Sequence, residues 1–174
     1  MRQTGIVRRM DELGRVVIPK ELRRTMRIRE GEEVEVFQKD DTLVLKKYSA
    51  VGEMIDFQLE YASSIYRTTG FTAIITDTDR VVAISGELGS ITKGTPIGEI
   101  LQDLINGRRT EVYHKKDLKP LFLGDINGVG GQVVAPIISS GDAMGAVVLY
   151  TKKEPTELAL KTAETASHFL AQRL

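Results

Sequence analysis

Cysteine is absent from this chain of 174 residues, as is tryptophan, and only two histidines occur. Without thiols the protein has no disulfide, no thiolate nucleophile and no cysteine-based zinc or iron–sulfur site. The two histidines, His114 and His168, stand apart in the sequence, whereas a structural zinc site normally takes four ligands. No Ser-His-Asp or Cys-His set is recognisable either. We therefore expect no enzyme, no metal and no cofactor.

Long apolar runs are also missing. No segment approaches the roughly 18 apolar residues of a membrane-spanning helix, and the first residues lack the charged-then-apolar pattern of a signal peptide. Hydrophobic residues make up 41% of the chain and the mean hydropathy is −0.13, which is ordinary for a globular protein. We expect a cytoplasmic protein with no membrane partner.

The net charge is zero, because 24 basic residues balance 24 acidic ones, but the charges are unevenly distributed. Residues 1–29 contain nine lysines and arginines and three acids, a net charge of +6. Residues 1–47 have a net charge of +3, and the remainder of the chain has −3. A basic segment in a neutral protein most often binds nucleic acid. The change of sign predicts two modules with different functions.

The first module contains short apolar pieces of strand length, at residues 5–7, 15–18, 33–37 and 42–45. Asp40-Asp41 predicts a hairpin turn between the last two pieces, and Pro19 opens a short predicted helix with Leu22 and Met26 on its buried side. Gly14 and Gly31 occupy predicted chain reversals, where a positive φ favours glycine. About 40 residues without a metal or disulfide seldom fold alone. We therefore predict an intertwined dimer whose strands close one shared barrel.

The same segment resembles the AbrB-type DNA-binding domain, a swapped-hairpin barrel. The resemblance rests on four stretches of sequence, Thr4-Gly-Ile-Val-Arg8, Asp11-Glu-Leu-Gly-Arg-Val-Val-Ile-Pro19, Glu21-Leu-Arg-Arg-Thr25 and Leu45-Lys-Lys-Tyr48. It implies a domain-swapped dimer that binds double-stranded DNA. The arginines that it places on the DNA-facing surface are Arg8, Arg15, Arg23 and Arg24, with Arg9 at a position that is also basic in the family.

Arginine suits this role physically, because one guanidinium holds a phosphate bidentately or grips guanine O6 and N7. If most of the arginines of a dimer meet phosphates, log K falls against log salt with a slope of roughly −4 to −7. The alternative is that they pair with Glu12, Glu21 or the acids of residues 30–35 on a solvated surface. Arg27 and Arg29, beside Glu30, are expected to form ordinary salt bridges.

The second module alternates helical and hairpin patterns. Helices are predicted at residues 51–69, 96–106 and 155–174, and hairpins at 71–76 with 81–85 and at 132–138 with 144–150. The glycine-rich stretch 124–131 has neither dinucleotide-binding nor P-loop spacing and predicts a loop. This order gives an α+β fold with an antiparallel sheet between helices, an α/β/α sandwich. It resembles a GAF-type sensor domain, particularly over residues 135–148.

The GAF resemblance implies a small ligand between sheet and loops, but the residues identify none. Glycines and charges in residues 86–131 either line a pocket or form plain loops. Bilin-binding and sulfoxide-reductase GAF domains rely on cysteine, which this chain lacks. A stripe of mostly small residues on the last predicted helix has two interpretations. It joins the first helix of this module in a dimeric bundle, or it covers its own sheet. These residues are Ala159, Ala163, Ala166 and Leu170, with Phe169 and Leu174.

Together the modules, predicted as residues 1–50 and 51–174, resemble sporulation-linked transcription regulators of endospore-forming bacteria. This implies an activator and repressor of sporulation genes, associated with the nucleoid in the forespore. Two kinds of two-fold contact would make a homotetramer, and the short joint at residues 48–50 would couple the modules mechanically. An antitoxin that regulates its own gene is the alternative for the first module. Its toxin-wrapping tail would be disordered, whereas residues 51–174 have an ordered pattern.

Overall fold

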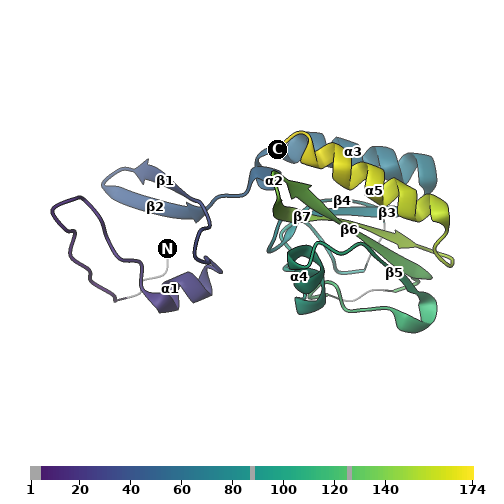
Figure 1. Ribbon diagram of the computed structural model, residues 1–174, viewed down its shortest axis with the longest axis horizontal. Helices are drawn as coiled ribbons and strands as arrows, with labels where there is room; N and C mark the ends of the chain where they lie inside the picture. Colours follow the sequence, from purple (N-terminus) through teal and green to yellow (C-terminus); the bar gives the residue numbers. More distant parts are fainter. Residues whose placement is uncertain (1–4, 87–88, 125–126) are drawn as a thin grey trace. The chain divides into compact units, whose positions relative to one another are not determined.

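A computed structural model describes residues 5–86, 89–124 and 127–174 (Figure 1). The chain divides into two compact units, Met1–Tyr48 and Ser49–Leu174. The division falls two residues before the predicted start of the second module, because Ser49 caps the first helix of unit 2. Among the described residues, no helix has the length and apolar character needed to cross a membrane.

Unit 1 contains helix α1 (Lys20–Thr25) and one antiparallel hairpin, β1 (Val34–Lys39) with β2 (Thr42–Lys47). The predicted turn at residues 40–41 is confirmed, and Val36 pairs with Leu45 across the hairpin. Pro19 precedes α1 with a φ of −57°, which is the helical value that proline fixes in advance. Gly14 and Gly31 have φ values of 75° and 83°, as their predicted positions in chain reversals require.

Two expected strands of unit 1 do not form within a single chain. Residues 5–7 and 15–18 belong to no helix or strand. Pro19 is the only buried residue in the described part of unit 1, residues 5–48. The predicted buried side of α1 is also wrong for the single chain, because Leu22 is half-buried and Met26 is 38% exposed. One copy of unit 1 therefore has apolar segments without a core to bury them.

Unit 2 is built on a five-stranded antiparallel sheet with the strand order β4-β3-β7-β6-β5. Helices α3 and α5 lie together on one face, and α4 lies on the other (Figure 1). The predicted α/β/α sandwich is thus confirmed. The strands are β3 (Thr72–Thr76), β4 (Val81–Ser85), β5 (Glu111–His114), β6 (Gly131–Ser139) and β7 (Asp142–Thr151). The helices are α2 (Ala50–Glu53), α3 (Ile55–Thr69), α4 (Glu99–Asn106) and α5 (Glu157–Ala171), with a short 3-10 turn η1 (Lys115–Asp117).

Alternation along the central strands divides the core of unit 2 into two layers. On β7, Val147 and Leu149 face the layer under α3 and α5, whereas Val148 and Tyr150 face the layer under α4. Each of these four residues is at most 2% exposed. The mostly small residues on the inner side of α5 belong to the layer under α3 and α5, so they cover their own sheet. These residues are Ala159, Ala163, Ala166 and Leu170.

Both predicted hairpins of unit 2 are confirmed, but the helices differ in their ends. The predicted helix 51–69 is interrupted at Met54, which separates α2 from α3. Helix α4 begins three residues late, because Pro96 and Ile97 form β-bridges with Arg80 and Phe122. Helix α5 is shorter at both ends than predicted. Strand β5 and turn η1 were not predicted. Within the stretch 124–131, residues 125–126 lie outside the described residues, and the others form a loop up to the start of β6.

Candidate nucleic-acid interface

The five candidate arginines come from three consecutive parts of unit 1. Arg8 and Arg9 precede the turn at residues 11–14, Arg15 follows it, and Arg23 and Arg24 lie in the last turn of α1. All five are exposed. The negative end of the helix dipole favours cations in a last turn, and Glu21 occupies the first turn, where an acid is favoured. The local sequence thus stabilises α1 while its arginines remain on the surface.

Asp11 organises the turn that presents Arg15. Its carboxylate accepts hydrogen bonds from the backbone N–H groups of Leu13, at 3.0 Å, and Arg15, at 2.8 Å. The Arg15 guanidinium also donates to Asp11 through Nε, at 2.8 Å. The Arg15 backbone N–H, followed by its guanidinium, lowers the pKa of Asp11. Asp11 therefore holds Arg15 in place while the other guanidinium nitrogens face solvent.

The bonding of the arginines differs from the solvated-surface alternative considered for the sequence. Asp11 is the acid that pairs with Arg15, and neither Glu12 nor Glu21 does so. Arg8 donates to the backbone carbonyl of Val7 at 3.0 Å. Within the described ranges, the side chains of Arg9, Arg23 and Arg24 form no hydrogen bond or ion pair. Their donors are available to an external anion. The four-residue spacing from Asp11 to Arg15 was the signal that sequence reasoning missed.

Glu32 fixes the loop that joins α1 to the hairpin. It accepts a hydrogen bond from the backbone N–H of Arg29 at 2.8 Å and pairs with Lys47 on β2 at 3.0 Å. Lys47 also donates to the carbonyl of Arg27 at 3.4 Å. The sequence pointed to Glu30 as the partner acid in this loop. Glu32 is the acid that links the loop to β2.

The layer of unit 2 under α4 contains a buried hydroxyl. Tyr150 is 2% exposed, and within the described residues its hydroxyl has no hydrogen-bond partner of normal geometry. Burial raises the pKa of Tyr150, and the nearby amide of Gln132 partly opposes this effect. That amide is bonded to both backbone groups of Lys119, at 2.9 and 2.8 Å. The ring of Phe122 lies 6.4 Å from the Tyr150 ring, centroid to centroid.

The start of unit 2 is fastened to the turn between β3 and β4. The Ser49 hydroxyl caps α2 by accepting from the N–H of Gly52 at 3.0 Å, and it donates to Asp77 at 3.1 Å. The other oxygen of Asp77 accepts the backbone N–H groups of Asp79 and Arg80. On α4, Gln102 donates to the Thr78 carbonyl at 3.2 Å. The turn between β3 and β4 therefore contacts both Ser49, at the start of unit 2, and helix α4.

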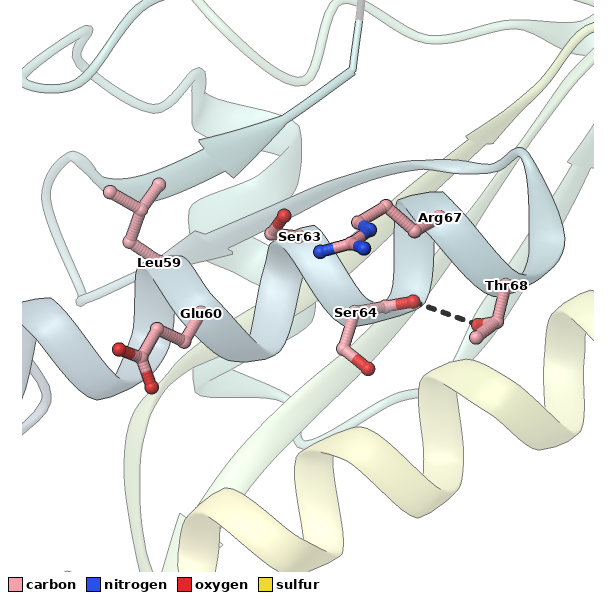
Figure 2. Close-up of a pocket in the computed structure, with 6 residues that line it drawn as sticks. All are labelled: Leu59, Glu60, Ser63, Ser64, Arg67 and Thr68. Atoms are coloured by element: carbon pink, nitrogen blue, oxygen red, sulfur yellow. Dashed lines mark hydrogen bonds between the residues drawn. The ribbon is translucent and has the colours of Figure 1, made fainter.

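The solvent face of α3 carries an open depression (Figure 2). Leu59, which was predicted on the packed side of this helix, lies here and is 50% exposed. The Arg67 side chain extends back along the helix toward Ser63 (Figure 2). The Thr68 hydroxyl donates to the Ser64 carbonyl at 2.8 Å. The depression is lined by Leu59, Glu60, Ser63, Ser64, Arg67 and Thr68.

The histidines do not form a metal site in the part of the chain that the structure describes. There, no group of three or more metal-binding side chains is found. His114 is exposed and lies 2.7 Å from a carboxylate oxygen of Glu154. His168 is exposed on α5.

Two family models match this chain in adjacent segments. Residues 53–174 match the model described as stage V sporulation protein T C-terminal, transcription factor. Residues 7–52 match the model described as antidote-toxin recognition MazE, bacterial antitoxin. The boundary between the matches lies close to the boundary between the two units.

Individual relatives agree with both parts. Stage V sporulation protein T of Bacillus subtilis (strain 168) is 41% identical over 176 residues, which cover 100% of this chain and 99% of the relative. The transition state regulatory protein AbrB of the same organism is 48% identical over 68 residues, or 36% of this chain and 71% of AbrB. The solved GAF domain region of a Geobacter sulfurreducens PCA protein has a TM-score of 0.55 at 15% identity, covering 69% of this chain and 91% of that one. This likeness confirms the GAF-like fold of unit 2.

Proposed function

This chain belongs to the stage V sporulation protein T family of transcription factors, and we propose that its unit 1 binds double-stranded DNA through Arg8, Arg9, Arg15, Arg23 and Arg24. The observation that carries the proposal is the exposure of these arginines, three of which have donors without a partner among the described residues. Guanidinium donors without a protein acceptor suit phosphates and guanine edges. The 48% identity to AbrB over the same region supports this assignment.

The DNA-binding form is a domain-swapped dimer. Unit 1 exposes large apolar side chains in the segments that precede α1, including Val7 at 85%, Leu13 at 75% and Val17 at 75%. A second copy that paired with these segments would complete a shared barrel and remove the apolar surface from water. The same pairing would present two sets of arginines across a two-fold axis, which suits a duplex with two half-sites. DNA binding would then depend on dimerisation.

The dimers are proposed to join through unit 2 into a homotetramer. Two linked DNA-binding dimers raise the effective concentration at neighbouring sites and bridge separated ones. The protein would act as an activator and repressor of sporulation genes, associated with the nucleoid in the cytoplasm of the forespore. The family description and the full-length relative support this role. The protein would have no catalytic activity.

A small ligand in unit 2 would regulate DNA affinity. The support is the layer under α4, where Tyr150 presents a buried hydroxyl without a regular partner. A ligand shifts an equilibrium only by its unequal affinity for two states. Isothermal titration with candidate metabolites, with and without operator DNA, therefore tests for coupling. Equal affinities in both titrations would refute regulation by that metabolite.

An antitoxin is the second candidate function, because residues 7–52 match the MazE antitoxin model. The structure of the rest of the chain favours the regulator. Unit 2 has two packed layers and a five-stranded sheet, whereas a toxin-wrapping tail would be disordered.

The decisive experiment measures DNA binding by arginine variants. Duplexes selected from genome-wide binding in sporulating cells would be titrated by fluorescence anisotropy at several salt concentrations. Arg15→Ala and Arg24→Ala should abolish specific binding while the dimer persists. Lys152→Ala, an exposed cation of unit 2, is the matched control and should bind as the wild type does. Wild-type affinity in either arginine variant would refute the role of that residue.

A further inference from the structure

We propose that Asn127 is a site of spontaneous covalent modification, at which the backbone nitrogen of Gly128 converts the asparagine amide into a carboxylate. The chain has only two asparagines, Asn106 and Asn127, and each is part of the sequence Ile-Asn-Gly. Asparagine is a thermolabile residue, and a following glycine leaves the attacking nitrogen unshielded because it has no Cβ. The sequence therefore offers two equivalent sites. The fold makes them different.

The reaction is an intramolecular substitution that needs only water and a base. The Gly128 backbone nitrogen gives its proton to hydroxide and attacks Cγ of Asn127, which forms an N–Cγ bond. The Cγ–Nδ2 bond breaks, and the amide nitrogen leaves as ammonia after taking a proton from water. The intermediate is a succinimide ring. Water then opens this ring at either carbonyl, giving aspartate or its isoaspartate isomer, in which the main chain passes through Cγ.

Helix α4 protects Asn106 from this reaction. Asn106 is the last residue of α4, and the backbone N–H of Gly107 donates to the carbonyl of Asp103 at 2.8 Å. The nitrogen must give up this hydrogen bond before it attacks the neighbouring side chain, and a backbone hydrogen bond is costly to leave unmade. The position is also crowded, because a Cβ at Gly107 would lie 3.0 Å from the same Asp103 oxygen. Attack on Asn106 therefore requires the last turn of α4 to open.

Asn127 lacks this protection. It lies in the loop that leads into β6, outside any helix or strand. In the part of the chain that the structure describes, neither its side chain nor the backbone N–H of Gly128 forms a hydrogen bond. Gly128 has a φ of 67°, and no atom lies within 4 Å of the position that a Cβ would take there. The nitrogen of Gly128 is therefore free to approach the amide of Asn127.

Exposure to solvent does not distinguish the two sites. Both asparagines and both following glycines are exposed, so water and hydroxide reach both. The difference lies in the backbone, because the nitrogen of Gly107 is held in a helix and that of Gly128 is not. Asn106 is therefore a control for Asn127 within the same molecule.

The products differ from the starting chain in charge and in backbone length. The new carboxylate adds one negative charge to residues 49–174, which have a net charge of −3. The isoaspartate form also adds one carbon to the main chain shortly before β6, where the backbone N–H of Gly130 donates to the Thr151 carbonyl at 2.7 Å. The added charge separates modified from unmodified chains on an ion exchanger, and the extra backbone carbon distinguishes the two products.

Ageing of the folded, full-length protein at neutral pH tests the proposal. Peptide mapping by mass spectrometry should find a gain of about 1 Da at Asn127, because –OH replaces –NH2. Asn106 should react at least about fivefold more slowly, because its attacking nitrogen is held by a hydrogen bond. The rate at Asn127 should rise with pH, since the nitrogen must lose its proton. Asn127→Gln is the matched variant and should suppress the change at this position, because its longer side chain would have to close a larger ring.

Unfolding tests whether the backbone is the cause of the difference. In concentrated urea α4 is lost, so Asn106 should react as fast as Asn127. A difference that persists in urea would overturn the proposal, because it would then come from the neighbouring sequence and not from the fold. An unmodified Asn127 in the aged, folded protein, or equal rates at the two sites in that protein, would also overturn it. None of these results depends on DNA binding, so the proposed function is tested separately.

Discussion

The two units of this chain bury their apolar residues in different ways. In unit 2, the sheet separates two layers of side chains that are almost fully removed from water. In unit 1, the described residues include a single buried position, Pro19, although the segment contains many valines, leucines and isoleucines. Unit 2 therefore has a buried core within one chain, whereas unit 1 leaves most of its apolar residues exposed.

The difference explains where the candidate function lies. The arginines proposed for DNA binding all belong to unit 1, the unit whose described residues include a single buried position. Within one chain, the segments that carry Arg8, Arg9 and Arg15 have no strand partner, and Asp11 fixes Arg15 alone among these three. Unit 2 contributes none of these arginines and has its own two-layered core.

The largest effect in this comparison is expected for Leu149→Ala. Leu149 is fully buried in the centre of unit 2, and truncating a buried leucine costs about 2–5 kcal/mol. The free energy of unfolding of unit 2, measured by urea titration with tyrosine fluorescence, should fall by that amount. The change should be the same at all protein concentrations. A loss under about 1 kcal/mol would contradict the close packing of this layer.

Val17→Ala should behave differently, although it also removes an apolar side chain. Val17 is 75% exposed in one chain, so a monomeric unit 1 would lose almost nothing. If the dimer buries Val17, each chain loses about 1.5 kcal/mol for two methyl groups. The unfolding midpoint of unit 1 should then rise with protein concentration, and the variant should require a higher concentration for the same midpoint. A midpoint independent of concentration would refute the shared barrel.

Sequence patterns predicted unit 2 better than unit 1. The hairpins of residues 71–85 and 132–150 followed from alternation and turn residues, and the α/β/α order followed from their sequence. The start of α4 was missed because Pro96 and Ile97 form β-bridges with distant segments, which no local pattern records. Strand β5 was missed because Glu111–His114 alternates weakly and depends on pairing with β6.

In unit 1, the same reasoning predicted strands that a single chain does not form. The patterns at residues 5–7 and 15–18 predicted strands of a barrel shared with a second copy, and in the single chain Val7 and Val17 are exposed. Charge identified the basic segment, and the resemblance to the AbrB-type domain selected the five arginines within it. The support that Asp11 gives to Arg15 was overlooked, because a local acid was interpreted only as a competitor for DNA. Leu59 was predicted on the packed side of α3 because it fitted an apolar helical repeat, whereas it is 50% exposed.

A moderate effect is expected at the joint between the units. Ser49→Ala removes the cap of α2 and the hydrogen bond to Asp77, and loss of a cap costs about 1 kcal/mol. Amide hydrogen exchange at Gly52 should accelerate. The control is Thr156→Ala at the N-cap of α5, where the side chain makes no capping bond, and its effect should be smaller. Equal losses of stability in the two variants would contradict a stabilising role for the hydrogen bonds of Ser49.

The smallest expected effect is a change in a pKa, and the two units shift the pKa values of their residues for different reasons. Burial raises the pKa of Tyr150 in unit 2, whereas hydrogen bonds lower the pKa of the exposed Asp11 in unit 1. A lowered carboxyl pKa stabilises the turn above the ordinary value of 3.8, and this stabilisation is lost as the pH falls through the lowered value. Arg15→Ala deletes the guanidinium but keeps the backbone N–H that is the larger cause. The pKa of Asp11 should therefore rise only part of the way to 3.8, as a carboxyl-carbon NMR titration would measure. An ordinary Asp11 pKa in the wild type would mean that the turn presenting Arg15 is not formed in solution.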